Sequence, residues 1–517
     1  MDVNILIVNG KCLSMDGKKI YDWVAVRDGR IAALGYGDAP EGICAERILN
    51  AKGCTVMPGF IDSHFHMVQT ALNRLFVDLS QAESFDDIAD LIRERGKENP
   101  EMGIQGIRID ETKLKEKRLP DRHEIDRFWN DSAVWLNTVD YLTSALNTYG
   151  LLYYKIPFTH MGVEWDDKNM PTGIFRKNAN NMLRDNILGN FNDFYRLDAL
   201  HKLMPHLAAQ GLTTVNAMEG GKVYSDRDAE FINDVIKNKR VYLDMELFFQ
   251  TLDTDRIQRM GLKRIGGSLY VDGTFSSRTA AISFDYADAP GNRGTLYFTQ
   301  ESLDSFVEDC YQRRVQLALY TIGDRAIDMA LKAHKRAMHL TGISGLRHRL
   351  EHVELPARTH IEQAADMGII FSMEPAYEAQ WGGPYGMYAE RLGQAFHRTN
   401  PFRQIVDGGV KICGGSDSDT TEINYIHAIY DATHHPVKEH SLTRMEAIRM
   451  FTFDGAFAIG EEKEKGLLGE GCIADIILLD GDILECGDDE LRSMKVETTI
   501  KNGRIVYEKG KFLDAED

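Results

Sequence analysis

The stretch between residues 55 and 413 alternates short apolar runs, typical of β-strands, with amphipathic runs typical of helices. Strand–helix–strand repetition implies parallel pairing with right-handed crossovers. The pattern predicts an α/β fold, a closed (β/α)8 TIM-like barrel. An open doubly wound sheet is the alternative, but no Gly-rich phosphate loop follows any of these strands. Eight runs have strand character, at residues 55–61, 212–217, 241–249, 268–271, 315–320, 349–353, 369–373 and 410–413, and amphipathic helices are expected over residues 324–340 and 359–367.

The two ends of the chain share a different pattern, in which short β-rich runs are separated by turns. Asn9-Gly10 and Asp28-Gly29 near the start, and Asn502-Gly503 near the end, are strong hairpin signals. Two half-sheets at opposite ends most simply pair into one small β-sandwich domain. We expect residues 1–57 and 466–517 to form it and residues 58–465 to form the barrel, with an insertion at about 80–200.

Composition limits the classes of partner. The chain has 79 Asp and Glu against 60 Lys and Arg, a net charge of −19, and an acidic chain repels nucleic acid. Its seven cysteines include no C-x-x-C pair, which indicates reduced thiols and a cytoplasmic location. No apolar run reaches membrane-spanning length and the N-terminus lacks signal-peptide features, so no membrane partner is expected. We expect an enzyme with a small-molecule substrate, and homodimer formation is left open.

The most informative segment chemically is PGFIDSHFH, residues 58–66. An apolar strand ends in His64-Phe65-His66, and the two-residue period of a strand points both imidazoles to the same side. Two neutral imidazoles at the carboxyl end of a strand suit a divalent metal. The alternative is a pair of loop histidines that are satisfied by hydrogen bonds.

Two further strands end in groups that can complete a metal site. Asp417 follows Gly414-Gly415, and its carboxylate can bind metal with one oxygen and take a proton from bound water with the other. Capping of the following helix is its alternative role. His352 takes the last inward position of the strand over residues 349–353. It is a candidate metal ligand, a candidate hydrogen-bond donor to the substrate, or a satisfied core histidine.

These motifs resemble those of the amidohydrolase superfamily, in particular the branch of N-substituted formamide deformylase-like metal-dependent hydrolases. The resemblance implies a TIM-like barrel, a small β-sandwich built from both termini, and hydrolysis by metal-bound water. It covers nearly the whole chain through PGFIDSHFH (58–66), GLTTV (211–215), VDGTFSSRTA (271–280), IGDRA (322–326), LEH (350–352), GGSDS (414–418), LTRMEA (442–447) and GLLGEGCIADIILLD (466–480).

The chain departs from this family at two positions. The branch usually has a carbamylated Lys that bridges two metals before Asp-Gly, and Ser268 stands there; it usually has a His before Ile-Gly-Asp, and Tyr320 stands there. Serine cannot be carbamylated, so we expect one divalent ion, Zn²⁺, rather than two. The resemblance then implies catalytic roles for Asp417, Tyr320 and His352, and the metal ligands His64, His66, Asp417 and, as a fourth, His352.

Three other residues have two interpretations each. Glu219 could replace the missing bridging group, although a solvated loop glutamate is the simpler interpretation. Arg278 and Arg325 lie in family motifs and could hold an anionic substrate group, or form ion pairs with the neighbouring Asp272 and Asp324.

The leading hypothesis for function is an amidohydrolase that acts on carbon–nitrogen bonds other than peptide bonds. Metal-activated water would cleave the C–N bond of an amide, formamide or cyclic amide. A non-hydrolytic enzyme on the same scaffold, such as a lyase, decarboxylase or isomerase, is the alternative, because fold does not fix reaction. A metal-free binding protein is a third hypothesis, against which the presence of His64, His66 and Asp417 argues.

Overall fold

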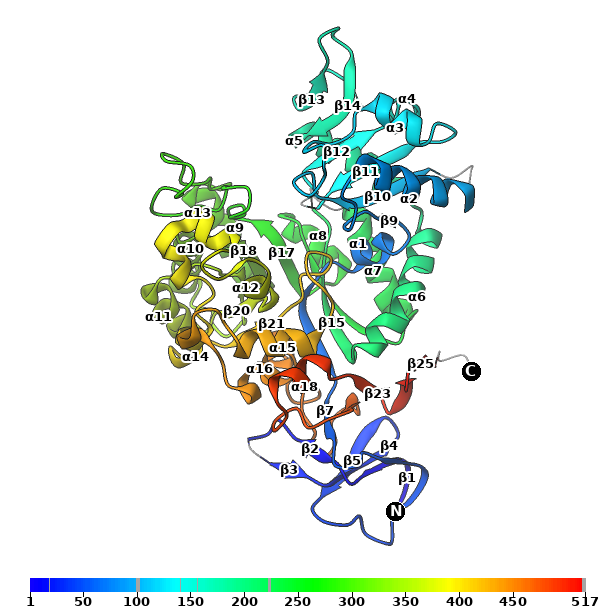
Figure 1. Ribbon diagram of the computed structural model, residues 1–517. Coiled ribbons are helices and arrows are strands. Elements are labelled where there is room, and N and C mark those ends of the chain that lie inside the picture. Colours follow the sequence, from blue (N-terminus) through cyan, green and yellow to red (C-terminus); the bar gives the residue numbers. More distant parts are fainter. Residues whose placement is uncertain (18, 99–102, 140, 156, 222–224, 514–517) are drawn as a thin grey trace. The chain divides into compact units, whose positions relative to one another are not determined.

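The computed structural model describes residues 1–517 except residues 18, 99–102, 140, 156, 222–224 and 514–517. The chain divides into two compact units. Figure 1 labels the helices and strands of both units. Unit 1 comprises Met1–Met67, Met204–Glu219 and Ile232–Asp517, and unit 2 comprises Val68–Leu203 and Gly220–Phe231. Three of the four boundaries fall within the helices α1 (Met67–Asn73), α6 (Asp193–Ala209) and α7 (Asp226–Asn238), and the fourth follows Glu219, the last residue of the strand β15 (Leu212–Glu219).

Unit 1 contains an eight-stranded sheet in which all neighbouring strands are parallel, in the order β21-β20-β19-β18-β17-β16-β15-β8. The remaining gap between β21 and β8 is bridged just beyond β21, where Phe65 pairs with Ser418 and the Asp417 N–H donates to the His64 carbonyl at 2.8 Å. The expected TIM-like barrel is present. Its strands are β8 (Phe60–Phe65), β15 (Leu212–Glu219), β16 (Asp244–Phe249), β17 (Arg264–Tyr270), β18 (Gln316–Thr321), β19 (Arg349–His352), β20 (Ile370–Met373) and β21 (Ile412–Gly414).

Helices connect the barrel strands, and the two helices predicted from the sequence are present as α10 and α11. The helix α10 buries Ile327, Leu331 and His334, spaced as one face of an amphipathic helix. The helices of this unit are α8 (Thr254–Met260), α9 (Gln300–Gln312), α10 (Asp324–Thr341), α11 (Arg358–Met367), α12 (Ala376–Trp381), α13 (Met387–Leu392), α14 (Phe402–Asp407), α15 (Tyr425–Thr433), α16 (Arg444–Met450), α17 (Phe453–Ile459) and α18 (Asp488–Ser493), with 3-10 turns at Gly393–Arg398 and Lys438–His440.

The first expected strand, residues 55–61, is in fact two strands that belong to different sheets. Thr55–Pro58 is β7, which pairs with β2 and β22, whereas the barrel strand β8 begins at Phe60. Gly59 lies between them, and a Cβ there would stand 2.2 Å from the Thr213 methyl group. Every residue of both strands is buried, so the apolar pattern continues across the change of sheet and conceals it.

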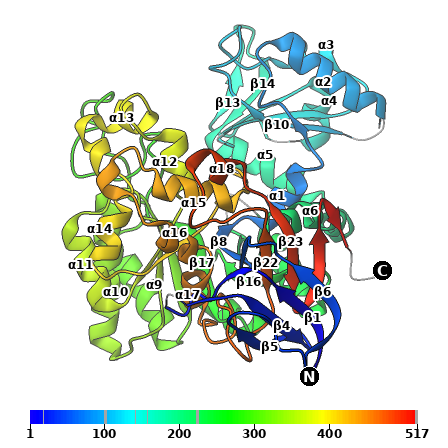
Figure 2. The ribbon, with the colours of Figure 1, turned by 60° about the horizontal axis from the view of Figure 1, so that its bottom comes forward.

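Strands from both chain ends form two more sheets in unit 1. In the seven-stranded sheet, β22 from the C-terminal segment pairs antiparallel with β7, and Figure 2 shows red and blue strands side by side. Ile7 and Val24 of the four-stranded sheet share a buried core with Val56 and Ile476 of the other. The sheets are β25-β24-β23-β22-β7-β2-β3 and β5-β4-β1-β6, with β1 (Asp2–Val8), β2 (Lys11–Leu13), β3 (Ile20–Tyr21), β4 (Trp23–Arg27), β5 (Arg30–Gly35), β6 (Cys44–Asn50), β7 (Thr55–Pro58), β22 (Ile476–Leu479), β23 (Val496–Lys501), β24 (Arg504–Glu508) and β25 (Lys511–Phe512).

Unit 2 has a six-stranded mixed sheet, in the order β13-β14-β12-β11-β10-β9, and a hydrophobic core of its own. That core joins Ile88 and Ile92 of α2 to Ile104, Val134 and Ile174 of the sheet. Its elements are β9 (Val77–Asp78), β10 (Ile104–Ile109), β11 (Val134–Thr138), β12 (Thr143–Leu146), β13 (Val163–Trp165), β14 (Pro171–Arg176), α2 (Phe85–Glu98), α3 (Arg122–Phe128), α4 (Thr148–Tyr154) and α5 (Lys177–Gly189).

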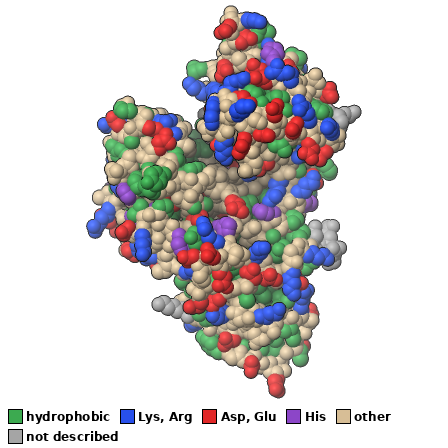
Figure 3. Space-filling model, in the orientation of Figure 1, with side chains coloured by type: hydrophobic (Ala, Val, Ile, Leu, Met, Phe, Trp, Pro, Cys, Tyr) green, Lys and Arg blue, Asp and Glu red, His purple; other side chains and the backbone are tan. Residues whose placement is uncertain are grey.

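The surface and the thiols agree with the composition. Acidic and basic side chains are interspersed on the face that Figure 3 draws. All seven cysteines are free. Among the described helices, none combines the length and the apolar character that crossing a membrane requires.

Candidate metal centre

His64, His66 and Asp417 come together at the carboxyl end of the barrel strands. His64 lies in β8, His66 follows that strand, and Asp417 follows β21. One ligand atom from each residue lies within 4.8 Å of the other two, and all three side chains are buried. Asp417 Oδ1 is 3.5 Å from His64 Nε2 and 3.2 Å from His66 Nε2. Ligands of one tetrahedral zinc ion lie about 3.4 Å apart, so the three groups are spaced to share an ion.

The second nitrogen of each imidazole faces a fixed acceptor. His64 Nδ1 is 2.7 Å from Glu351 Oε2, and His66 Nδ1 is 2.9 Å from the Met218 carbonyl oxygen. Histidines that bind metal characteristically donate their other N–H in this way, which turns the Nε2 lone pair toward the ion. His64 Nε2 is buried and has no hydrogen-bond partner among the described residues. A divalent metal would supply that partner, so the donor set fits one.

Glu351 is held as an anion by a buried guanidinium. Burial alone would raise the pKa of Glu351, but Arg349 and the hydrogen bond with His64 lower it to about 2. Arg349 donates to both carboxylate oxygens, at 2.9 Å and 2.7 Å, and also to the Ser63 carbonyl at 2.5 Å. Glu351 therefore stays ionised at neutral pH and accepts a hydrogen bond from His64 Nδ1.

The two oxygens of Asp417 have different partners. Oδ1 faces the two imidazoles, whereas Oδ2 accepts the phenol O–H of Tyr377 at 2.5 Å. Burial would raise the pKa of Asp417, but the hydrogen bond with His66 and the nearby His64 and His352 hold it well below its usual range. Asp417 also has φ 46°, in the left-handed region that non-glycine residues seldom adopt. Such strained positions concentrate at functional sites.

His352 lies beside this group but outside it. Its ring centroid is 4.8 Å from that of His64, and its Nδ1 is 2.7 Å from Glu374 Oε2. The ring stacks on Tyr377 at 5.8 Å and meets the Tyr320 ring edge-on at 4.5 Å. Burial raises the pKa of Glu374 well above its usual range, against an opposing effect of His64. The structure thus brings three of the four expected ligands together, and His352 lies outside this group.

The two positions at which the chain departs from the family pattern lie in barrel strands. Ser268 is buried in β17, and Tyr320 is buried in β18 against His352. Glu219 is the last residue of β15 and is fully buried, so the interpretation as a solvated loop glutamate was wrong. Its carboxylate is not part of the three-residue group.

A sequence profile described as "Amidohydrolase family" matches residues 47–507. The chain belongs to the amidohydrolase family. It is similar to N-substituted formamide deformylase of Arthrobacter pascens, with 25% identity over 98% of each chain. It is also similar to the putative amidohydrolase YtcJ of Bacillus subtilis, with 26% identity over 94% of this chain and 96% of that one.

A solved structure of similar fold supports the architecture of this amidohydrolase. An uncharacterized metal-dependent hydrolase from Pyrococcus furiosus superposes with a TM-score of 0.76 at 22% identity, covering 93% of this chain and 100% of that one. Membership of the family makes the protein an enzyme, a hydrolase of the metal-dependent class.

The two arginines of the family motifs do not have the expected partners. Arg278 pairs with Asp288 at 2.6 Å rather than with Asp272. Asp272 is buried and accepts the backbone N–H groups of Ala281 and Gly323 at 2.7 Å and 2.8 Å. The Arg325 side chain is exposed and makes no ion pair within the part of the chain that is described.

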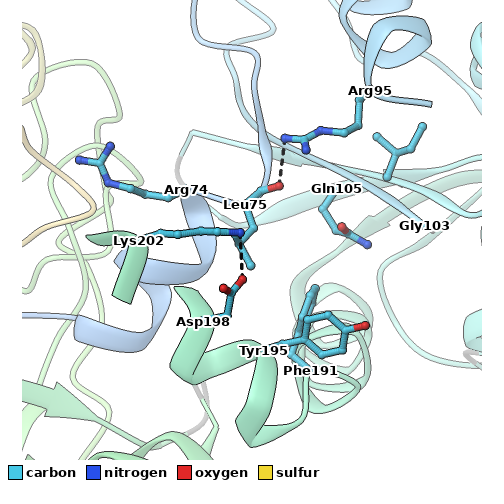
Figure 4. A pocket seen from close by; sticks show the side chains of 10 residues that line it. Arg74, Leu75, Arg95, Gly103, Gln105, Phe191, Tyr195, Asp198 and Lys202 are labelled. Atoms are coloured by element: carbon cyan, nitrogen blue, oxygen red, sulfur yellow. Dashed lines mark hydrogen bonds and ion pairs between the residues drawn. The ribbon is translucent and has the colours of Figure 1, made fainter. Parts of the chain in front are cut away.

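Unit 2 has a pocket of about 320 Å³, whose lining includes Arg74, Phe191 and Tyr195 (Figure 4). Lys202 pairs with Asp198 at 2.9 Å, and Arg95 donates to the Leu75 carbonyl at 3.1 Å. Its lining contains no histidine or cysteine. These pairings already satisfy two of its three cations, so it carries no comparable set of reactive groups.

Proposed function

We propose that this amidohydrolase cleaves a C–N bond other than a peptide bond, in an amide, formamide or cyclic amide of small size. The observation that carries the proposal is the buried group of His64, His66 and Asp417, with both imidazoles fixed through Nδ1. The full-length similarity to an N-substituted formamide deformylase supports the formamide class.

We propose one divalent ion, Zn²⁺, held by His64, His66 and Asp417. Two imidazole nitrogens and a carboxylate oxygen are usual zinc donors. When bound, the ion lowers the pKa of a water molecule toward neutrality and polarises a carbonyl group. A single ion is favoured because Ser268 and Tyr320 occupy the places of two further family ligands. His352 faces the same centre but lies outside the group of three, which favours a role toward the substrate.

Asp417 is proposed as the group that moves the proton. A carboxylate offers about four lone-pair sites, so Oδ2 can accept a proton from the attacking water while Tyr377 holds the carboxylate in place. As the C–N bond breaks, its electron pair stays on nitrogen, and Asp417 returns the proton there. Tyr320 and His352 then serve as hydrogen-bond donors to the substrate.

The experiment that tests this function combines metal analysis with a substrate panel. Zinc-loaded protein is incubated with N-alkyl and N-aryl formamides, linear amides, cyclic amides and, as a separate arm, carboxylic acids. Formation of one carboxyl and one amino group per bond cleaved supports the proposal: an acid and an amine from a formamide or linear amide, or a single ring-opened amino acid from a cyclic amide. Asp417→Asn is the matched control. Turnover confined to the carboxylic acids, without hydrolysis, would favour the lyase or decarboxylase alternative.

Three coarser assignments accompany this function. We propose residues 1–57 and 466–517 as a β-sandwich domain and residues 58–465 as the barrel with an insertion at about 80–200; residues 514–517 lie outside the described residues. The seven free thiols favour a cytoplasmic location. A homodimer is proposed as the state to test by light scattering.

A further inference from the structure

The barrel closes where β8 meets residues 415–418, a contact that we call the seam. The eight-stranded sheet ends with β8 on one side and β21 on the other. Beyond β21, Phe65 bridges to Ser418, and the N–H groups of Asp417 and His66 donate to the carbonyls of His64 and Ser418 at 2.8 Å and 2.9 Å. All three proposed metal ligands belong to the two chain segments that meet here, so the seam sets the distances between them.

A buried carboxyl group, that of Asp62 in β8, adds side-chain hydrogen bonds across the seam. Its Oδ1 accepts the backbone N–H groups of His64 at 3.0 Å and of Ser416 at 3.1 Å. Its Oδ2 accepts the Ser416 hydroxyl at 2.6 Å and the phenol O–H of Tyr425, in α15, at 2.9 Å. Ser416 Oγ also accepts the Ser418 N–H at 3.1 Å. Asp62 therefore ties β8 to residues 416–418 and to α15.

The groups that donate to Asp62 lie next to the ligand atoms. One is the backbone N–H of His64 itself, and another is that of Ser416, which directly precedes Asp417. A shift of either backbone would move a ligand, whereas a metal site tolerates only about 0.2 Å of variation in its ligand distances. Each oxygen of Asp62 accepts at least two hydrogen bonds. In Asp62→Asn the amide NH₂ would therefore face other donors whichever way it turned.

We propose that Asp62 is the positioning residue that fixes the distance between the imidazole pair and Asp417, and that the affinity of the centre for a divalent ion depends on it. This inference rests on the proposed metal-dependent hydrolysis and concerns its metal-binding step alone. Groups that orient metal ligands from behind typically change metal affinity by about 10–100-fold when they are substituted.

A second buried carboxyl group, that of Asp272, offers a matched control. It accepts the backbone N–H groups of Ala281, Ile322 and Gly323 at 2.7 Å, 3.0 Å and 2.8 Å, so an amide there would also face donors. The segments that it joins follow β17 and β18 and contain none of the three ligands. Asp272→Asn should therefore share a general destabilisation with Asp62→Asn and leave the centre intact.

The zinc affinity of the full-length protein, measured by competition with a chromophoric chelator, tests the inference. We expect the zinc Kd to rise about 10–100-fold in Asp62→Asn and to stay within about twofold of the wild type in Asp272→Asn. The unfolding midpoint of the metal-free protein should fall in both variants. Tyr425→Phe removes one donor and keeps the ring, and it should raise the zinc Kd about threefold, the effect of one lost hydrogen bond.

Bound Co²⁺ gives a second readout that needs no substrate. Its visible absorption bands depend on the ligand geometry, so they should shift in Asp62→Asn and not in Asp272→Asn. A zinc Kd that is unchanged in Asp62→Asn, or raised equally in Asp272→Asn, would overturn the inference. If Asp62→Asn does not fold, an unchanged Kd in Tyr425→Phe would do so, as would a wild type without zinc affinity. If the zinc Kd responds as expected while no amide is hydrolysed, the proposed function fails and the inference stands.

Discussion

The two ends of the barrel both bury charged side chains, but they differ in how completely lysine or arginine partners neutralise them. At the amino end of β16, Asp244 meets Lys501 at 2.8 Å and also pairs with Lys465, and Lys501 reaches Asp475 at 2.9 Å. At the carboxyl end, imidazoles and carboxyl groups gather around Asp417. Neither Asp417 nor Glu374 has a lysine or arginine partner within the described residues.

This difference separates stability from chemistry. Paired charges at the amino end join β23 and the segment before β22 to a barrel strand, so they tie the terminal strands to the barrel. A surplus of acceptors at the carboxyl end is suited to a cation that the protein does not itself supply. In barrels of this type, residues at the carboxyl end serve activity and those at the amino end serve stability. A change at the carboxyl end should therefore lower metal content and activity and leave stability nearly unchanged. A change at the amino end should lower stability and leave metal content and activity unchanged.

The largest effect is expected from His64→Ala combined with His66→Ala. The double variant loses both nitrogen donors and should bind no metal and hydrolyse nothing, while circular dichroism and the unfolding midpoint stay close to the wild type. Elemental analysis of the purified protein measures the metal. Full metal stoichiometry in this variant would show that the centre lies elsewhere.

Asp417→Asn should come next. The amide keeps one oxygen donor, so part of the metal should remain, but the proton acceptor is lost and kcat should fall by about 10²–10⁴-fold. Steady-state kinetics on the best amide of the panel, with metal content measured in parallel, checks both parts. Turnover near that of the wild type would exclude Asp417 as the proton acceptor.

The barrel could be predicted from the sequence because strand and helix periods alternate along it, as α10 and α11 show. The break between β7 and β8 could not be predicted, because the residues of both strands are buried and form one continuous apolar run in the sequence. Position at a strand end was enough to identify His64, His66 and Asp417 as neighbours, since the carboxyl ends of parallel strands meet at one edge.

The partners of these residues could not be predicted from local pattern. Glu351 and His352 are adjacent, and a regular strand would point them to opposite sides. The left-handed backbone at His352 breaks that rule, and both side chains contact groups of the centre. Tyr377 and Glu374 were missed because they follow β20, where no periodicity marks a functional position. The sequence signal that could have marked this position is the Glu374-Pro375 pair, which directly follows the apolar run over residues 369–373.

Lys501→Met tests the amino end of the barrel. The substitution leaves the buried Asp475 without its cation, and breaking such a buried pair costs about 3–5 kcal/mol. Asp244 is 38% exposed and keeps Lys465 as a partner, so it adds little to this loss. Urea unfolding should show the loss as a lower midpoint. Zinc content and kcat of the folded protein should not change. A loss of zinc without a lower unfolding midpoint would contradict the assignment of stability to the amino end and of activity to the carboxyl end.

A pH dependence of stability is expected from two buried histidines away from the centre. Burial lowers the pKa of His334 to about 3 and that of His348 well below its usual value. The unfolded chain takes up protons near pH 6.5 while the fold keeps both rings neutral. Their contribution is therefore complete above pH 6.5 and declines below it, by about 1.4 kcal/mol per histidine and pH unit. Unfolding midpoints at pH 7.5 and 5.5 measure this slope, and it should be smaller in His334→Gln.

The smallest effect is expected from Tyr320→Phe, which tests how the carboxyl end compensates for the family's missing histidine. The ring packs edge-on against His352 at 4.5 Å, and phenylalanine keeps that contact while removing the hydroxyl. If the phenol donates one hydrogen bond to the substrate alongside His352, its loss should lower kcat/KM by about tenfold, the value of one such bond. Metal content should not change. A loss as large as that of Asp417→Asn, accompanied by loss of zinc, would instead make Tyr320 a ligand. The residue at the position of the family's usual histidine would then bind the metal as a phenolate rather than donate a hydrogen bond to the substrate.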